Sequence, residues 1–192
     1  VIVLQNGASV SLIDNYGSIT HETGWGVRNF QGAIGTILNQ SGATLNGIVN
    51  LTPQTGTNTI TKIHNIGTIG VNNYSGTNSY NLAAIYNKLN ATIGTLRNEG
   101  SIIGNPGGSQ YKDAIRNESG TIDLIENLGT IQGGNPSVSY YDIYNQNGTI
   151  TELINAQGYA TTDPLSYKGV LPTTYKILIN SASDYGQFRG SS

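Results

Sequence analysis

Acidic side chains are the groups in this sequence with the most potential for catalysis. Two or three carboxylates that converge on a groove would allow general acid and base chemistry on a polysaccharide. The closest acidic cluster contains Glu118, Asp123 and Glu126, with Asp113 and Asp142 expected on adjacent turns of the chain. Because Glu118 falls in an expected turn and Glu126 has Arg97 as an expected neighbour, we predict no catalytic residues. A polysaccharide-active enzyme is the alternative hypothesis.

Other reactive groups are scarce. The absence of cysteine excludes disulfide frameworks and thiolate metal sites. His21 and His64 are far apart and have no acidic residue at ligand spacing except Glu22, so we predict no metal site and no cofactor. Only 10% of the residues are charged and the net charge is −2, which disfavours a nucleic-acid partner.

A repeat organises the chain that must position these side chains. Each unit contains an apolar residue, any residue, and Asn, followed by Gly and Ile within about five positions. The longer version occurs as IRNESGTI (115–122) and IYNQNGTI (143–150) and again at residues 85–93, with a looser copy, VRNFQGAI (27–34). The shorter version occurs as IENLGTI (125–131), LRNEGSI (96–102), IHNIGTI (63–69) and IDNYGSI (13–19). The two versions alternate.

The period of the repeat indicates the fold. The step is 30 residues from Asn87 to Asn117 and 28 from there to Asn145. Apolar residues spaced by two exclude helical repeats and predict short strands. We therefore predict an all-β, right-handed parallel β-helix (β-solenoid). It would have roughly five to six coils of about 24–33 residues each, with Asn and Ile ladders.

The Asn residues of the repeat are predicted to be structural. Equivalent residues in stacked coils lie about 4.8 Å apart, so an Asn amide can bond to the Asn of the next coil. This bond would offset the cost of placing an amide in a dry interior. The predicted ladder residues are Asn15, Asn29, Asn39, Asn65, Asn87, Asn98, Asn117, Asn127, Asn145 and Asn155.

Residues between the apolar position and Asn are predicted to point outward. In the longer version they are Arg28, Tyr86, Arg116 and Tyr144, which would stack as cation–π pairs. In the shorter version Arg97 and Glu126 would form an exposed pair of small energetic value. Trp25, which lies between two glycines, is predicted to cover the first coils rather than to bind a ligand.

Three segments rich in Gly, Asn, Ser and Tyr interrupt the repeat at residues 70–82, 104–113 and 133–141. Because each follows the shorter version of the unit, we expect all three to emerge from the same corner. Aromatic rings among small polar residues suit sugar or protein recognition. The candidate recognition residues are Tyr74, Tyr80, Tyr111, Tyr140 and Tyr141. Covering an open edge of the coil is the alternative role for them.

The repeat fades after about residue 160. We predict β-helix repeats over residues 1–160, and a capping or module-linking segment over residues 161–192. A strand is expected at residues 175–180, after the breaker Leu171-Pro172.

The units at residues 113–122 and 124–133 resemble repeats in autotransporter passengers of the vacuolating-cytotoxin-like group of epsilonproteobacteria. The tail LPTTYKILINSASDYGQF (171–188) is similar to a segment found late in such passengers. The resemblance implies a β-helical passenger that is exported through the outer membrane by its own C-terminal barrel. The chain lacks the long apolar N-terminal stretch by which the pore-forming toxin inserts, so we expect no membrane insertion by this fragment.

These observations together favour a structural and adhesive module over an enzyme. We expect a fragment of an autotransporter passenger, secreted or displayed on the bacterial cell surface, that acts as a virulence factor in host colonisation. Its expected partners are a host-cell surface protein or glycan, the rest of its own passenger and the barrel. A toxin-like subunit is a further alternative.

Overall fold

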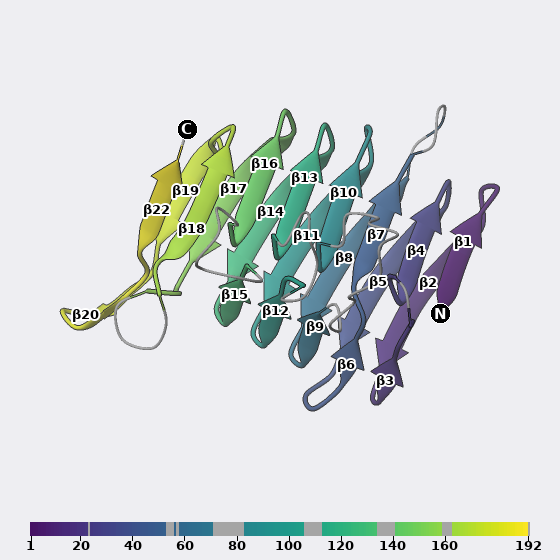
Figure 1. Cartoon of the computed structure of the whole chain (residues 1–192), viewed down its shortest axis with the longest axis horizontal. Helices are drawn as coiled ribbons and strands as arrows, with labels where there is room; N and C mark the ends of the chain where they lie inside the picture. The colour runs from purple at the N-terminus through teal and green to yellow at the C-terminus, as the bar shows by residue number, and fades with distance from the viewer. Residues whose placement is uncertain are drawn as a thin grey trace.

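A computed structural model describes residues 1–22, 24–52, 56, 58–70, 83–105, 113–133, 141–158 and 163–191. Every regular element within these residues is a β-strand, and the strands form stacked parallel sheets along one axis (Figure 1). The chain runs from the N-terminal coil at one end of the stack to the C-terminal coil at the other. The predicted parallel β-helix is confirmed.

Three parallel sheets form the sides of the helix. The first sheet contains β1 (Ile2–Gln5), β4 (Val27–Phe30), β7 (Ile48–Leu51), β10 (Ile85–Lys88), β13 (Ile115–Glu118), β16 (Ile143–Gln146), β18 (Leu165–Gly169) and β22 (Phe188–Ser191). The second contains β2 (Ser9–Asn15), β5 (Ala33–Asn39), β8 (Thr59–Asn65), β11 (Thr92–Asn98), β14 (Thr121–Asn127), β17 (Thr149–Asn155) and β19 (Thr174–Ile177). The third contains β3 (Ser18–Ile19), β6 (Thr44–Leu45), β9 (Thr68–Gly70), β12 (Ser101–Ile103) and β15 (Thr130–Gln132).

The strand register gives the length of each coil. Along the second sheet the aligned residues are Ser9, Ala33, Thr59, Thr92, Thr121 and Thr149, which are steps of 24, 26, 33, 29 and 28 residues. These steps agree with the predicted coil length. In the first sheet the step between aligned residues varies more, from 21 residues between Val27 and Ile48 to 37 between Ile48 and Ile85. The reason is that segments of unequal length connect the sheets. The second sheet has seven strands and the third has five, so five coils carry a strand in all three sheets.

Columns of aliphatic residues form the core. β-Branched residues suit a pleated strand, and alternate positions point inward. One column of the second sheet contains Ile34, Ile60, Ile93, Ile122 and Ile150, all at most 1% exposed. Each such side chain contributes roughly 1.5–3 kcal/mol by burial. The Ile ladder is thus the main apolar support of the rod.

The turn after the second sheet requires close approach of one coil to the next. A Cβ atom on Gly100 would lie 2.1 Å from the carbonyl oxygen of Gly67, and one on Gly129 would lie 2.2 Å from that of Gly100. Such contacts with backbone atoms exclude larger residues. This explains why Gly follows Asn by two positions in the shorter version of the repeat.

The sheets continue through the tail. Beyond the predicted boundary at residue 160, β18 pairs with β16 and β19 pairs with β17, in parallel. Gly169 and Ile177 occupy the positions of the two Asn columns in this coil. The short strands β20 (Ile179–Ser181) and β21 (Asp184–Tyr185) then pair in antiparallel fashion before β22 returns to the first sheet. The tail therefore adds to the β-helix as well as ending the ladders.

Candidate binding face

Two Asn ladders run through the interior. In the first ladder, each Nδ2 donates to the Oδ1 of the next coil at 2.9–3.0 Å, through Asn29, Asn50, Asn87, Asn117 and Asn145. In the second, the same bonds measure 2.8–3.0 Å through Asn15, Asn39, Asn65, Asn98, Asn127 and Asn155. The Asn ladders expected from the repeat are present, and all ten predicted residues belong to them.

Each ladder amide also holds the backbone of a corner. For Asn117, Nδ2 lies 3.1 Å from the carbonyl oxygen of Gly120 and 3.2 Å from that of Thr149. The side chain therefore joins its own turn to the next coil and has no atom left for a reacting group. The ladders are a structural device.

One ladder residue, Asn50, was missed by the sequence reasoning. The unit Ile48-Val49-Asn50 has the apolar residue and the Asn at the expected spacing, but the Gly and Ile that follow in other units are absent. The next buried Ile, Ile60, comes ten residues after Asn50. At the corner before it, the buried side chain of Asn58 donates to the carbonyl oxygen of Asn29 at 2.9 Å. The three-residue signal alone would have found Asn50.

The outer side of the first sheet carries aromatic and charged side chains. Between the inward residues, aligned positions are Arg28, Val49, Tyr86, Arg116, Tyr144 and Lys168. The Arg116 Cζ atom lies 4.6 Å from the centroid of the Tyr144 ring, as predicted for this column. However, Tyr86 and Arg116 are only 5% and 2% exposed, so this outer column is not a solvated row at its centre.

On this outer surface, Glu118 binds two side chains of the neighbouring strand β10. Its carboxylate accepts a 2.5 Å bond from the Tyr86 hydroxyl and lies 3.0 Å from Lys88 Nζ. Burial alone would raise the pKa of Glu118, but the bonds from Tyr86 and Lys88 outweigh it and lower the pKa. Burial and Glu118 together raise the pKa of Tyr86 to about 12. Glu118 ends β13, so its predicted place in a turn is wrong.

Two further acids support the backbone. Asp142 accepts bonds of 2.7 Å from the backbone nitrogens of Gly133 and Ser166, which ties two coils together. Asp113 lies 3.3 Å from Arg116 Nη1 and accepts from the backbone nitrogen of Tyr141. Burial raises the pKa of both carboxyl groups. Both acids are engaged in structural contacts.

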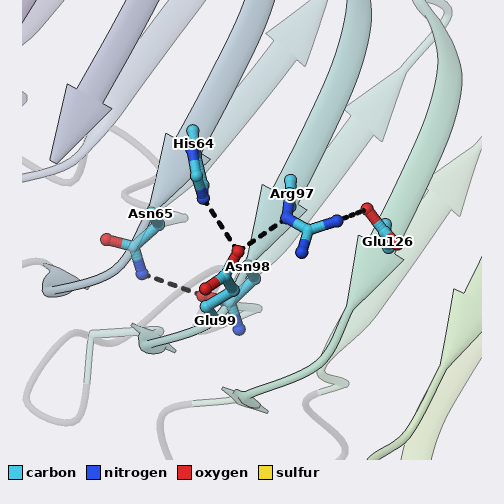
Figure 2. A network of polar contacts seen from close by, with 6 residues as sticks. All are labelled: His64, Asn65, Arg97, Asn98, Glu99 and Glu126. Atoms are coloured by element: carbon cyan, nitrogen blue, oxygen red, sulfur yellow. Dashed lines mark hydrogen bonds and ion pairs between the residues drawn. The ribbon is translucent and has the colours of Figure 1, made fainter.

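The outer side of the second sheet carries a separate polar network (Figure 2). Glu99 accepts from Arg97 Nε at 2.7 Å and lies 3.0 Å from His64 Nε2. Arg97 Nη1 also reaches Glu126 Oε2 at 2.5 Å, which confirms the predicted pair. Bonds from Arg97 and His64 lower the pKa of Glu99.

The acidic cluster of the sequence is therefore divided between surfaces. Glu118 lies in the first sheet and Glu126 in the second, and cations already bind both carboxylates. Asp123 lies exposed in β14. Within the described ranges, no group of three or more His, Asp or Glu residues could hold a metal ion. The described residues also contain no helix of the length and hydropathy needed to cross a membrane.

Four of the five candidate tyrosines, Tyr74, Tyr80, Tyr111 and Tyr140, lie outside the described residues. The fifth, Tyr141, is half-buried, and its ring centroid lies 5.4 Å from Lys168 Nζ. Lys168 Nζ is also 5.5 Å from the centroid of the Tyr144 ring. The lysine thus lies by two aromatic rings on the outer side of the first sheet.

Trp25 packs on the same side of the first sheet. Its ring centroid is 6.1 Å from that of Tyr86, two coils away, and its Nε1 donates to the carbonyl oxygen of Ala83 at 2.9 Å. With Val49 and Leu51 these residues form a small apolar cluster outside the main core. Trp25 packs across the coils of β4, β7 and β10.

We call the outer side of β10, β13, β16 and β18, with Tyr141, the binding face. Its partly exposed side chains are Lys88, Glu118, Tyr141, Tyr144 and Lys168, and the buried side chains of Tyr86 and Arg116 lie among them. The fold defines the chain as a parallel β-solenoid with an interior of aliphatic columns and two hydrogen-bonded Asn ladders. Comparison with protein-family models, with curated proteins and with solved structures finds no match to this chain.

Proposed function

We propose that the chain is a structural and adhesive module of a bacterial passenger protein, secreted or displayed at the cell surface, with recognition on the binding face. The observation that carries this proposal is the group of partly exposed side chains Tyr141, Tyr144 and Lys168 on the outer side of the first sheet. Tyrosine and arginine are typical of recognition surfaces, because they offer large contact areas at a low cost in conformational entropy.

The rod beneath this face suits display away from a surface. Continuous Asn and Ile columns hold successive coils in one register, so side chains on the outer side keep fixed spacings. The resemblance of the repeats and tail to autotransporter passengers supports export as the setting. The proposed partners are a host-cell surface protein or glycan, the remainder of the passenger and an outer-membrane barrel.

Catalysis has less support. A polysaccharide-cleaving site needs carboxylates that converge and have oxygens free to exchange protons. Here Glu118 is bound by Tyr86 and Lys88, and Asp142 is bound by two backbone nitrogens.

Binding of the purified chain to a glycan array and to epithelial cells tests the proposal. The first variant combines Tyr141→Ala with Tyr144→Ala, and a second variant changes Tyr80, Tyr111 and Tyr140 to Ala. Tyr16→Ala is the matched control, because Tyr16 is 76% exposed and follows β2 in another part of the coil. We expect binding to fall in the first two variants and to persist in the control, with β-rich circular dichroism unchanged. Absence of binding by the parent chain would leave it as a scaffold.

A further inference from the structure

We infer that the C-terminal part of the binding face is a site for an acidic sugar, in which Lys168 binds the sugar carboxylate and Tyr141 and Tyr144 flank the ring. This inference rests on the proposed function and names the ligand class of the same face. The juxtaposition behind it is a lysine beside two half-exposed tyrosines, at the end of the face that has the fewest paired cations.

The partners of the basic residues distinguish Lys168 from most others. Carboxylates lie within 4.0 Å of Lys88, Arg97, Arg116 and Lys176. Among the described residues, none lies at this distance from Lys168. A cation–π contact uses the charge of an ammonium group but does not consume its three N–H donors. Lys168 therefore keeps donors for an anionic ligand.

A second cation lies on the neighbouring strand. Arg189 in β22 is exposed and aligns with Ser166, two residues before Lys168 in β18. Two acids lie near these cations. Burial raises the pKa of Asp142 and of Asp113, and the charges of Arg189 and Lys168 oppose that rise. Both oxygens of Asp142 already accept a backbone N–H, and Asp113 binds Arg116 and the backbone nitrogen of Tyr141. Neither cation forms a direct ion pair with a carboxylate of the described residues, so the N–H donors of Lys168 and Arg189 can bind a ligand.

The same place offers contact area for a sugar ring. Tyrosine rings present a flat apolar surface with a hydroxyl at the edge, which suits the C–H face and the hydroxyls of a pyranose. A carboxylate on that pyranose would complement Lys168, and the guanidinium of Arg189 can donate two parallel bonds to it. A neutral sugar would use the rings alone, and an acidic peptide would use the cations alone.

Isothermal titration calorimetry with an oligosaccharide of hexuronic acids tests the inference. The same oligosaccharide with its carboxyl groups reduced to alcohols is the neutral probe. Lys168→Gln removes the proposed contact, whereas Lys176→Gln removes a lysine of the second sheet that pairs with Glu152. We expect Lys168→Gln to weaken binding of the acidic probe about tenfold or more, as expected for loss of a charged hydrogen bond, and Lys176→Gln to leave it unchanged. The neutral probe should bind the parent chain and the Lys168→Gln variant equally weakly. Its affinity should match that of the Lys168→Gln variant for the acidic probe.

Three outcomes would overturn the site. They are equal affinity for acidic and neutral probes, equal loss in both variants, and equally tight binding of an oligoglutamate peptide. If the chain binds epithelial cells and excess uronate oligosaccharide does not compete, the adhesive function stands and the acidic-sugar site is wrong. If the chain binds neither cells nor any glycan, the adhesive function itself is wrong.

Discussion

The two sides of the first sheet differ although the same strands form both. On the inner side, five consecutive strands place Asn at one position, and all five side chains are fully buried. On the outer side, the adjacent position is occupied in turn by Arg28, Val49, Tyr86, Arg116 and Tyr144. The inner column repeats one residue, and the outer column changes at every strand.

The reason for the difference is hydrogen-bond chemistry. Asn carries both a donor and an acceptor, so each amide satisfies the next and the column can continue without a second residue type. A dry interior allows no alternative, because a buried group without a partner costs about 1–3 kcal/mol. Outside, neighbours need only complement each other, as Arg116 complements Tyr144 and Tyr86 complements Glu118. Residues on the outer side can therefore change without loss of the fold.

Breaking the inner column should give the largest effect. Asn117→Ala would leave Asn87 Nδ2, Asn145 Oδ1 and two backbone carbonyls without their partner. We expect the free energy of unfolding, measured in urea, to fall by at least about 3 kcal/mol. Asn15→Ala, at the end of the other ladder, should cost about 1 kcal/mol, since β2 pairs only with β5 among the described strands. Equal losses at the two positions would contradict the ladder as a cooperative element.

Glycines at the corner test the same inner geometry. Gly100→Ala would place a methyl group 2.1 Å from the carbonyl oxygen of Gly67, so the coils must separate locally. We expect a loss of about 1–3 kcal/mol by thermal or urea unfolding. Gly17 follows Asn15 as Gly100 follows Asn98, but a Cβ atom there would meet nothing within 4 Å. Gly17→Ala should therefore be close to neutral, and a similar loss at both sites would rule out coil-to-coil contact as the cause.

On the outer side, Tyr86→Phe removes the bond to Glu118 but keeps the ring. We expect a loss of about 1–2 kcal/mol near neutral pH. Because the folded state lowers the pKa of Glu118, this stabilisation is present above the unfolded pKa and is lost as pH falls through the folded one. The folded state also raises the pKa of Tyr86 to about 12, so the stabilisation from this bond is lost again as pH rises through that value. Unfolding of both proteins from pH 3 to 8 should show the difference closing in acid; a constant difference would refute the bond.

The network on the second sheet should give the smallest effect. Arg97→Gln removes contacts with Glu99 and Glu126 that are partly exposed to solvent. We expect a change within about 1 kcal/mol that shrinks further in high salt. A loss as large as that of Asn117→Ala would show that the outer side is as constrained as the inner one.

Sequence reasoning was most successful for the inner side. The alternation of apolar residue and Asn gave the strands, the coil length and the ladders, because a column of identical residues leaves a periodic signal. It missed Asn50, whose unit lacks the usual Gly. The repeat in the sequence fades at about residue 160, whereas β18 and β19 continue the sheets beyond it. In that last coil Gly169 and Ile177 replace Asn, so the periodic pattern in the sequence ends one coil before the parallel sheets do.

The outer side was predicted less completely. Alternation correctly placed Arg116 next to Tyr144, but it could not show that Arg116 is buried, because burial depends on what covers the strand. Tyr86 and Lys88 as partners of Glu118 were also missed. These residues are about thirty positions apart, and only the register of the stacked coils brings them together.

The sequence by itself determined the parallel β-helix and its two Asn ladders. Each repeat unit contains both the apolar positions that form the strand and the Asn that bonds to its copy in the next coil. Only the tertiary structure decided which charges meet across coils, which acids are bound to backbone or cations, and that Lys168 lies beside Tyr141 and Tyr144. The physical reason is that inner positions must match copies of themselves. Outer positions match whatever residue the neighbouring coil places about 4.8 Å away.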